Sequence, residues 1–151
     1  MHGLADRYAI PVLILFHTIG LGIFLYRDRP LGLSGFNMLL CATLLLVSSE
    51  AYRLELTSLV GISLGGFVLE AIGVNTGLLF GTYEYGAELG WKALGVPVVL
   101  GFNWYCVVAL GAHFVRSVAQ QRPLWLKAIL AGLVAPLLDF LIEPVAMHYD
   151  F

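Results

Sequence analysis

Long apolar runs separated by short polar connections make up most of this chain. Each run is close to the roughly 20 residues that an α-helix needs to cross the hydrocarbon core of a bilayer. The runs predict an all-α fold, a polytopic membrane helix bundle in a single domain (residues 1–151). About five transmembrane helices are expected, at Tyr8–Tyr26, Leu33–Val47, Leu56–Leu69, Val96–Val115 and Leu124–Ile142.

The stretch between the third and fourth runs, Asn75–Gly95, has a different character. It carries five glycines and three charged residues, which is too polar and too glycine-rich for an ordinary span. Non-helical backbone survives at membrane depth only where protein or a water-filled cavity covers it. The stretch is therefore predicted to be either an interfacial loop or a re-entrant segment, and the sequence does not separate the two.

Composition supports a bilayer environment. The chain is 60% hydrophobic and 12% charged, with a mean hydropathy of +0.88, whereas soluble domains carry about 25% charged residues. The net charge of −2, without a basic stripe, argues against a nucleic-acid partner. Cys41 and Cys106 lie inside apolar runs without metal-ligand or disulfide spacing. With five spans, five basic residues lie on the same side of the membrane as the N-terminus and three lie on the opposite side. This difference favours a cytoplasmic N-terminus by the positive-inside rule.

One predicted helix face collects small residues around a carboxylate. Ser63, Gly66, Glu70, Gly73 and Gly77 are three or four positions apart, so on a helix they are neighbours. Small residues allow another helix to approach closely. Glu70 is therefore predicted to point into the bundle, and an intramembrane carboxylate is a candidate functional group. An interhelical hydrogen bond is the structural alternative.

A second pair of carboxylates lies in the last run. Asp139 and Glu143 are one helical turn apart, and Pro136 is a turn earlier. Two such groups in a low dielectric favour sharing one proton, which gives a protonated acid beside a carboxylate that can act as a base. Glu143 at the membrane surface would instead be solvated, and Glu84 and Glu88 are expected to be solvated too.

Aromatic residues crowd the middle of the chain. Interfacial anchoring accounts for some of them, but Trp104 lies about nine residues into its predicted helix with Asn103 beside it. An amide next to an indole at that depth suggests a pocket wall, and aromatic faces also stabilise cations. His17 and His113 lack the second pair that would favour haem, and a single hydrogen-bonded histidine on an interior face is the commoner case.

Three motifs resemble the membrane carotenoid hydratases, the family that includes the γ-carotene 1′,2′-hydratases and the bisanhydrobacterioruberin hydratases. They are EAIGVNTGLLFGTYEYGAELG at Glu70–Gly90, GVPVVLGFNW at Gly95–Trp104 and LLDFLIEPVAMHYDF at Leu137–Phe151. In the second half of the chain the resemblance covers the motifs in detail. In the first half it covers only the hydropathy pattern. Family members continue past the equivalent of Asp150–Phe151, so this chain is expected to lack a C-terminal segment of the family.

The resemblance implies a cofactor-independent hydro-lyase, without metal, in a bacterial cytoplasmic membrane. It would add water across the terminal C1–C2 double bond of an acyclic carotenoid, lycopene-like or γ-carotene-like. The positions that match family motifs are Glu70, Asn75, Thr76, Tyr83, Tyr85, Asn103, Trp104, Asp139 and Glu143.

The residue chemistry suggests roles for these positions. Glu70 or Asp139 would protonate C2, and Glu143 would hold the proton or the water. The aromatic residues Tyr83, Tyr85 and Trp104, with the polar Asn75, Thr76 and Asn103, would surround the substrate, the C1 cation and the water.

Three other functions stay open at this point. A carotenoid end-group cyclase begins with the same protonation, but a neighbouring double bond captures the cation. A transporter also combines buried carboxylates with broken helices, although the chain shows no repeated halves. An assembly subunit would use the carboxylates for helix association, and a homo-oligomer is likewise left open.

Overall fold

The computed structural model describes residues 4–27, 32–48, 52–79 and 81–148. Within these ranges, the side chains of residues 4–7, 52–54, 139, 146 and 147 lie outside the description. The predicted all-α bundle is confirmed, and the helices and two short strands are α1 (Leu4–Arg27), α2 (Ser34–Ser48), α3 (Tyr52–Thr76), β1 (Lys92–Ala93), β2 (Val96–Pro97), α4 (Val99–Val118) and α5 (Leu124–His148).

Four of the described helices are long and apolar enough to cross a membrane: α1, α3, α4 and α5. The protein is therefore an integral membrane protein. The remaining helix, α2, has 15 residues and a length of about 22 Å. This is shorter than a hydrocarbon core of about 30 Å, so α2 falls short of the full span expected for the second apolar run.

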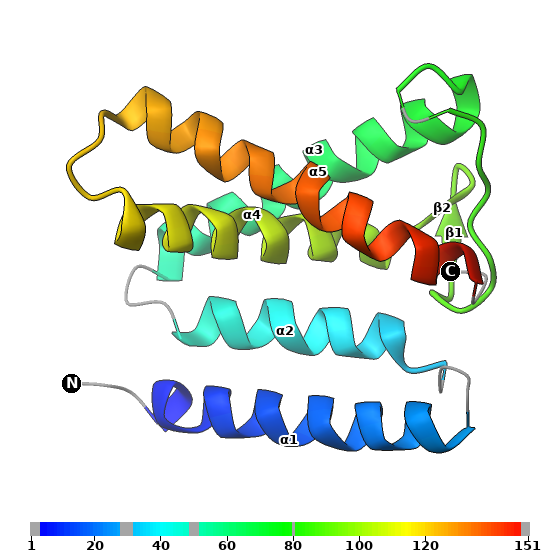
Figure 1. Cartoon of the computed structure of the whole chain (residues 1–151), viewed down its shortest axis with the longest axis horizontal. Helices are drawn as coiled ribbons and strands as arrows, with labels where there is room; N and C mark the ends of the chain where they lie inside the picture. Colours follow the sequence, from blue (N-terminus) through cyan, green and yellow to red (C-terminus); the bar gives the residue numbers. More distant parts are fainter. Residues whose placement is uncertain (1–3, 28–31, 49–51, 80, 149–151) are drawn as a thin grey trace.

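Helix α4 is the centre of the bundle. It packs against α2, α3 and α5, whereas α1 packs against α2 at the edge (Figure 1). Much of the outer surface of α1 and α5 is exposed leucine, isoleucine and phenylalanine, which suits contact with lipid. The most buried helix surface is that of α4, where it faces α3.

Helix α3 runs further than its apolar pattern suggested, to Thr76 rather than Leu69. It ends at Gly77, which has φ +65° and donates its N–H to the Gly73 carbonyl at 2.8 Å. Glycine takes this left-handed conformation readily and is a common helix terminator. Glu70 is six residues before the end of α3, which places it about 9 Å inside that end along the helix axis.

Residues 77–98, here named the cap, lie at one end of the bundle (Figure 1). The cap connects the candidate spans Glu55–Thr76 and Val99–Val118, and its place at one end of the bundle favours the interfacial over the re-entrant interpretation. It carries the antiparallel pair β1 and β2, in which Ala93 faces Val96.

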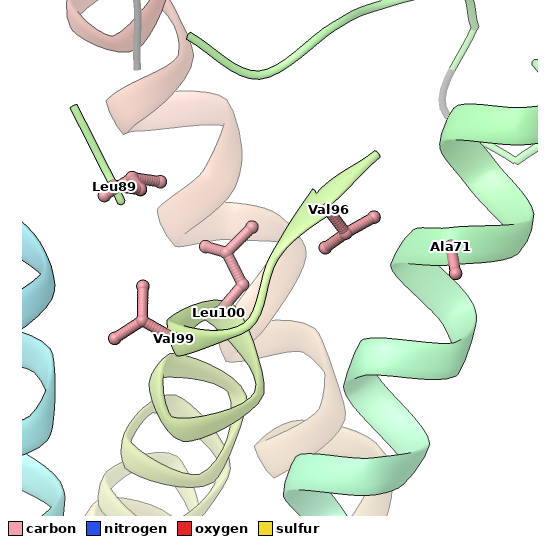
Figure 2. Packing of buried hydrophobic residues seen from close by; sticks show 5 residues of the cluster. All are labelled: Ala71, Leu89, Val96, Val99 and Leu100. Carbon is pink, nitrogen blue, oxygen red and sulfur yellow. The ribbon is translucent and has the colours of Figure 1, made fainter. Parts of the chain in front are cut away.

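The inner side of the cap belongs to a hydrophobic core. Leu89 and Val96 of the cap are buried with Ala71 of α3 and with Val99 and Leu100 of α4 (Figure 2). Val96 is fully buried, with 0% of its surface exposed. This core holds the cap against the ends of α3 and α4.

The turn between β1 and β2 contains a strained residue. Leu94 has φ +52° and Gly95 has φ +81°, so both central residues of the turn are left-handed, as in the type I′ turn that Asn-Gly forms best. A left-handed non-glycine residue costs roughly 1–2 kcal/mol, and the Leu94 side chain is 71% exposed, so it packs little.

We therefore expect Leu94→Asn to stabilise the protein by about 1 kcal/mol, because asparagine tolerates this conformation better. Thermal unfolding in detergent measures the change. A melting temperature equal to or below that of the wild type would show that the turn does not store this strain.

Candidate active site

The Glu70 carboxylate accepts three hydrogen bonds from aromatic side chains. Its Oε2 accepts from the hydroxyl of Tyr83 at 2.8 Å and from that of Tyr85 at 2.7 Å. Its Oε1 accepts from the indole Nε1–H of Trp104 at 3.0 Å. These four residues are named the Glu70 cluster. They come from α3, the cap and α4, so the cluster forms only when all three are folded together.

The small-residue face predicted on α3 is what brings Trp104 to Glu70. A Cβ atom on Gly66 would lie 2.3 Å from Cγ of Trp104, so the indole fills the space that the glycine leaves. On α4, a Cβ atom on Gly101 would lie 2.7 Å from the Ser63 carbonyl oxygen. The two helices therefore cross at their small residues, as predicted, and Glu70 faces α4 one turn beyond Gly66.

The two tyrosines reach the same oxygen because of their spacing. Residues two apart in an extended segment point to the same side, and the rings of Tyr83 and Tyr85 meet edge to face, with centroids 5.4 Å apart. Lys92 donates a hydrogen bond from Nζ to the Tyr85 carbonyl. The tyrosine segment is thereby tied to β1.

Asn75 and Thr76, both expected near substrate, have positioning contacts in the structure. The Asn75 amide donates to the Ala71 carbonyl at 2.8 Å and to the Leu94 carbonyl at 2.9 Å, which joins α3 to the cap turn. The Thr76 hydroxyl donates to the Ile72 carbonyl at 2.6 Å. Asn75 therefore sets where the cap lies on α3, and Thr76 supports the end of the helix.

The environment of Tyr85 keeps its phenol protonated. Burial, and then the hydrogen bond to the Glu70 carboxylate, raise the pKa of Tyr85 well above its ordinary value of 10.0. Because the folded protein holds this proton more tightly than the unfolded chain, the stabilisation is complete below about pH 10 and declines as the pH rises further.

We expect the wild type to lose thermal stability more steeply above about pH 10 than Tyr85→Phe, which has no phenol to ionise. Melting temperatures measured between neutral and alkaline pH test this. Tyr26→Phe is the control, since Tyr26 is 91% exposed. Identical slopes for the wild type and Tyr85→Phe would contradict the expectation.

An open pocket of ≈ 520 Å³ adjoins the cluster. Its lining residues are Val74, Asn75, Thr82, Tyr83 and Glu84. Val74 is one helical turn beyond Glu70, and the Tyr83 hydroxyl bonds Glu70 directly. Tyr83 is therefore shared by the pocket and the cluster. Thr82 was not among the residues predicted from the sequence pattern.

The predicted residues of α4 and α5 lie in different surroundings. Trp104 is the sixth residue of α4, not about the ninth, because the helix begins at Val99 rather than Val96. Asn103 is half-buried on α4, about 100° around the helix from Trp104. Glu143 is exposed on α5. The side chain of Asp139 lies outside the described residues, so its convergence with Glu70 stays a prediction.

Comparison with known proteins identifies the family. The model of a family described as carotenoid biosynthesis protein matches residues 10–151. The chain belongs to the carotenoid biosynthesis protein family. No curated protein and no solved structure matches it. All four residues of the Glu70 cluster fall within the part matched by the carotenoid biosynthesis family.

The described part of this carotenoid biosynthesis protein contains no recognisable metal-binding site. There, no group of three or more His, Cys, Asp or Glu side chains is placed to hold a metal ion. His17 instead contacts the Leu13 carbonyl through Nδ1 at 2.8 Å and Asn37 through Nε2 at 3.3 Å. It serves as a polar link between α1 and α2.

Proposed function

We propose that the protein is a carotenoid hydratase that adds water across the terminal C1–C2 double bond of an acyclic carotenoid end group. The observation that carries the proposal is the set of three hydrogen-bond donors on the Glu70 carboxylate. In the proposal, the Glu70 carboxylate takes up a proton before the reaction, and the resulting carboxylic acid protonates C2.

Three donors on one carboxyl group suit an acid that must release its proton to carbon. Protonating an alkene creates a carboxylate and a tertiary cation at the same moment. Donors already 2.7–3.0 Å from the two carboxyl oxygens stabilise the negative charge as it develops. Preorganised donors of this kind are often the largest single contribution to catalysis.

The same residues suit the positive charge. The π-faces of tyrosine and tryptophan attract cations, and two tyrosine rings and one indole surround the carboxyl group. When water attacks the C1 cation, a C–O bond forms and one water proton returns to the Glu70 carboxylate. The product is a tertiary alcohol, and the acid is regenerated without any other reactant.

The depth of Glu70 suits a substrate dissolved in lipid. Because Glu70 lies about 9 Å inside the end of α3, only the carotenoid end group has to reach it, while the polyene stays among the acyl chains. Asp139 remains the second candidate for the acid. Glu143 remains the candidate that holds a proton or a water beside Asp139.

Pigment analysis tests the proposal. The chain is expressed in cells that make lycopene or γ-carotene, and the carotenoids are weighed by mass spectrometry against cells without the chain. A hydratase produces a carotenoid heavier by one water. A cyclase produces an isomer of unchanged mass, and an assembly subunit produces neither, so either of those results would contradict the proposal.

A further inference from the structure

The open pocket beside the Glu70 cluster has features that the acid chemistry alone does not explain. Three of its lining residues, Asn75, Thr82 and Glu84, are polar and exposed. The fourth polar residue, Tyr83, is partly buried and turns its hydroxyl to Glu70. The pocket therefore lies beside the tyrosine that hydrogen-bonds the Glu70 carboxyl group.

The pocket also lies at the end of a candidate membrane span, where the water interface is expected. Its residues are the last turn of α3 and the start of the cap, at and beyond the end of the candidate span Glu55–Thr76. Polar side chains at that level face the interface rather than hydrocarbon. A carotenoid comes from the lipid, whereas water comes from the cap side, and Glu70 lies between the two.

We propose that this pocket is the water-binding site of the enzyme, which delivers the water that captures the carotenoid cation. The inference rests on the proposed function. The exposed Asn75, Thr82 and Glu84 form the entrance, and the partly buried Val74 and Tyr83 form the inner wall.

Water supply determines which product forms. After Glu70 has protonated C2, the C1 cation has two outcomes. Water from the pocket can add to C1, which gives the alcohol and returns one water proton to Glu70. Without water, a methyl group on C1 loses a proton to the Glu70 carboxylate, which gives an isomeric alkene that keeps the proton added to C2. The pocket residues therefore set the ratio of hydrated to unhydrated product, while the Glu70 cluster sets the rate of protonation.

The two steps are separable in heavy water. In D₂O, Glu70 delivers deuterium to C2, and this label stays on C2 both when water adds to C1 and when a methyl group on C1 loses the proton instead. The test compares the wild type with Thr82→Phe, in which a large apolar ring fills the entrance, and with Leu78→Phe, which adds the same ring at a cap residue that is 83% exposed and outside the pocket lining. Carotenoids from membranes incubated in D₂O are analysed for alcohol and for carbon-bound deuterium.

We expect Thr82→Phe to lower the ratio of alcohol to labelled unhydrated carotenoid about 10²-fold, the scale of loss when a reactant is misplaced by about an ångström. Leu78→Phe keeps the wild-type ratio. An unchanged ratio in Thr82→Phe, or a parallel loss of alcohol and label, would overturn the water site. If Thr82→Phe does not accumulate in membranes, Glu84→Trp on the same entrance gives the same comparison.

Failure of the proposed function looks different. A wild type that forms neither alcohol nor labelled carotenoid refutes the hydration itself. A wild type that forms both, with a ratio insensitive to the entrance variants, refutes only the pocket.

Discussion

Glu70→Gln is expected to reduce formation of the hydroxylated carotenoid by about 10²–10⁴-fold, the range that general acid catalysis contributes. Glutamine has nearly the same shape but no proton to give. Its amide nitrogen also cannot accept a hydrogen bond from Tyr83, Tyr85 or Trp104, so at least one donor of the cluster loses its partner. The measurement is the amount of alcohol per unit of protein in the membrane.

Glu55→Gln is the matched control for this variant. Glu55 lies on the same helix and accepts a hydrogen bond from the Tyr105 hydroxyl at 3.1 Å. It is 15 residues from Glu70 on α3, which is about 22 Å along the axis. The amide oxygen of glutamine can still accept the Tyr105 bond, so alcohol formation should stay at the wild-type level. Equal activity in Glu70→Gln and the wild type would remove Glu70 from the chemistry.

The second large effect is expected for Gly66→Ala. The added Cβ would lie 2.3 Å from Cγ and 2.6 Å from Cβ of Trp104, so the α3–α4 crossing must open or the indole must move. Overpacking a closely fitted interface costs roughly 1–3 kcal/mol. Because Trp104 is also a donor to Glu70, alcohol formation should fall together with stability.

Gly65→Ala isolates the steric cause. Gly65 is the neighbour of Gly66 on α3, but a Cβ atom there meets nothing within 4 Å. It should leave the melting temperature in detergent unchanged or slightly higher, since alanine favours a helix more than glycine does. If Gly66→Ala melts no lower than Gly65→Ala, the close approach of Trp104 to α3 is wrong.

The helices could be predicted from the sequence because apolar runs of bilayer length define them. The face of Glu70 was also accessible, because Ser63 and Gly66 recur at helical spacing around it and mark where another helix approaches. The exact ends of the helices were harder to predict. Polar residues interrupt the apolar run after Leu69, although α3 continues to Thr76 and is ended by the left-handed Gly77.

The partners of Glu70 in the cap were not accessible from the sequence. Tyr83 and Tyr85 were recognised as candidates, but nothing in the pattern placed both on Glu70. That contact depends on the path of the cap, which is set by the bond from Asn75 to the Leu94 carbonyl and by the burial of Val96. Contacts between segments with no shared periodicity leave no signal in a single sequence.

The last helix shows a further limit. The one-turn spacing of Asp139 and Glu143 predicts a shared face, but it does not say which neighbour that face meets. In the structure α5 packs on α4, and Glu143 is exposed. The acid chemistry in this account is therefore centred on α3, the cap and α4.

The most direct test uses the purified protein in lipid vesicles with lycopene in D₂O, with the products analysed by mass spectrometry and NMR. If Glu70 protonates C2, we expect a tertiary alcohol with one deuterium bound to the adjacent carbon. We expect this alcohol to be lost in Glu70→Gln but not in Glu55→Gln. An alcohol without carbon-bound deuterium, or an equal yield from Glu70→Gln, would contradict protonation by Glu70.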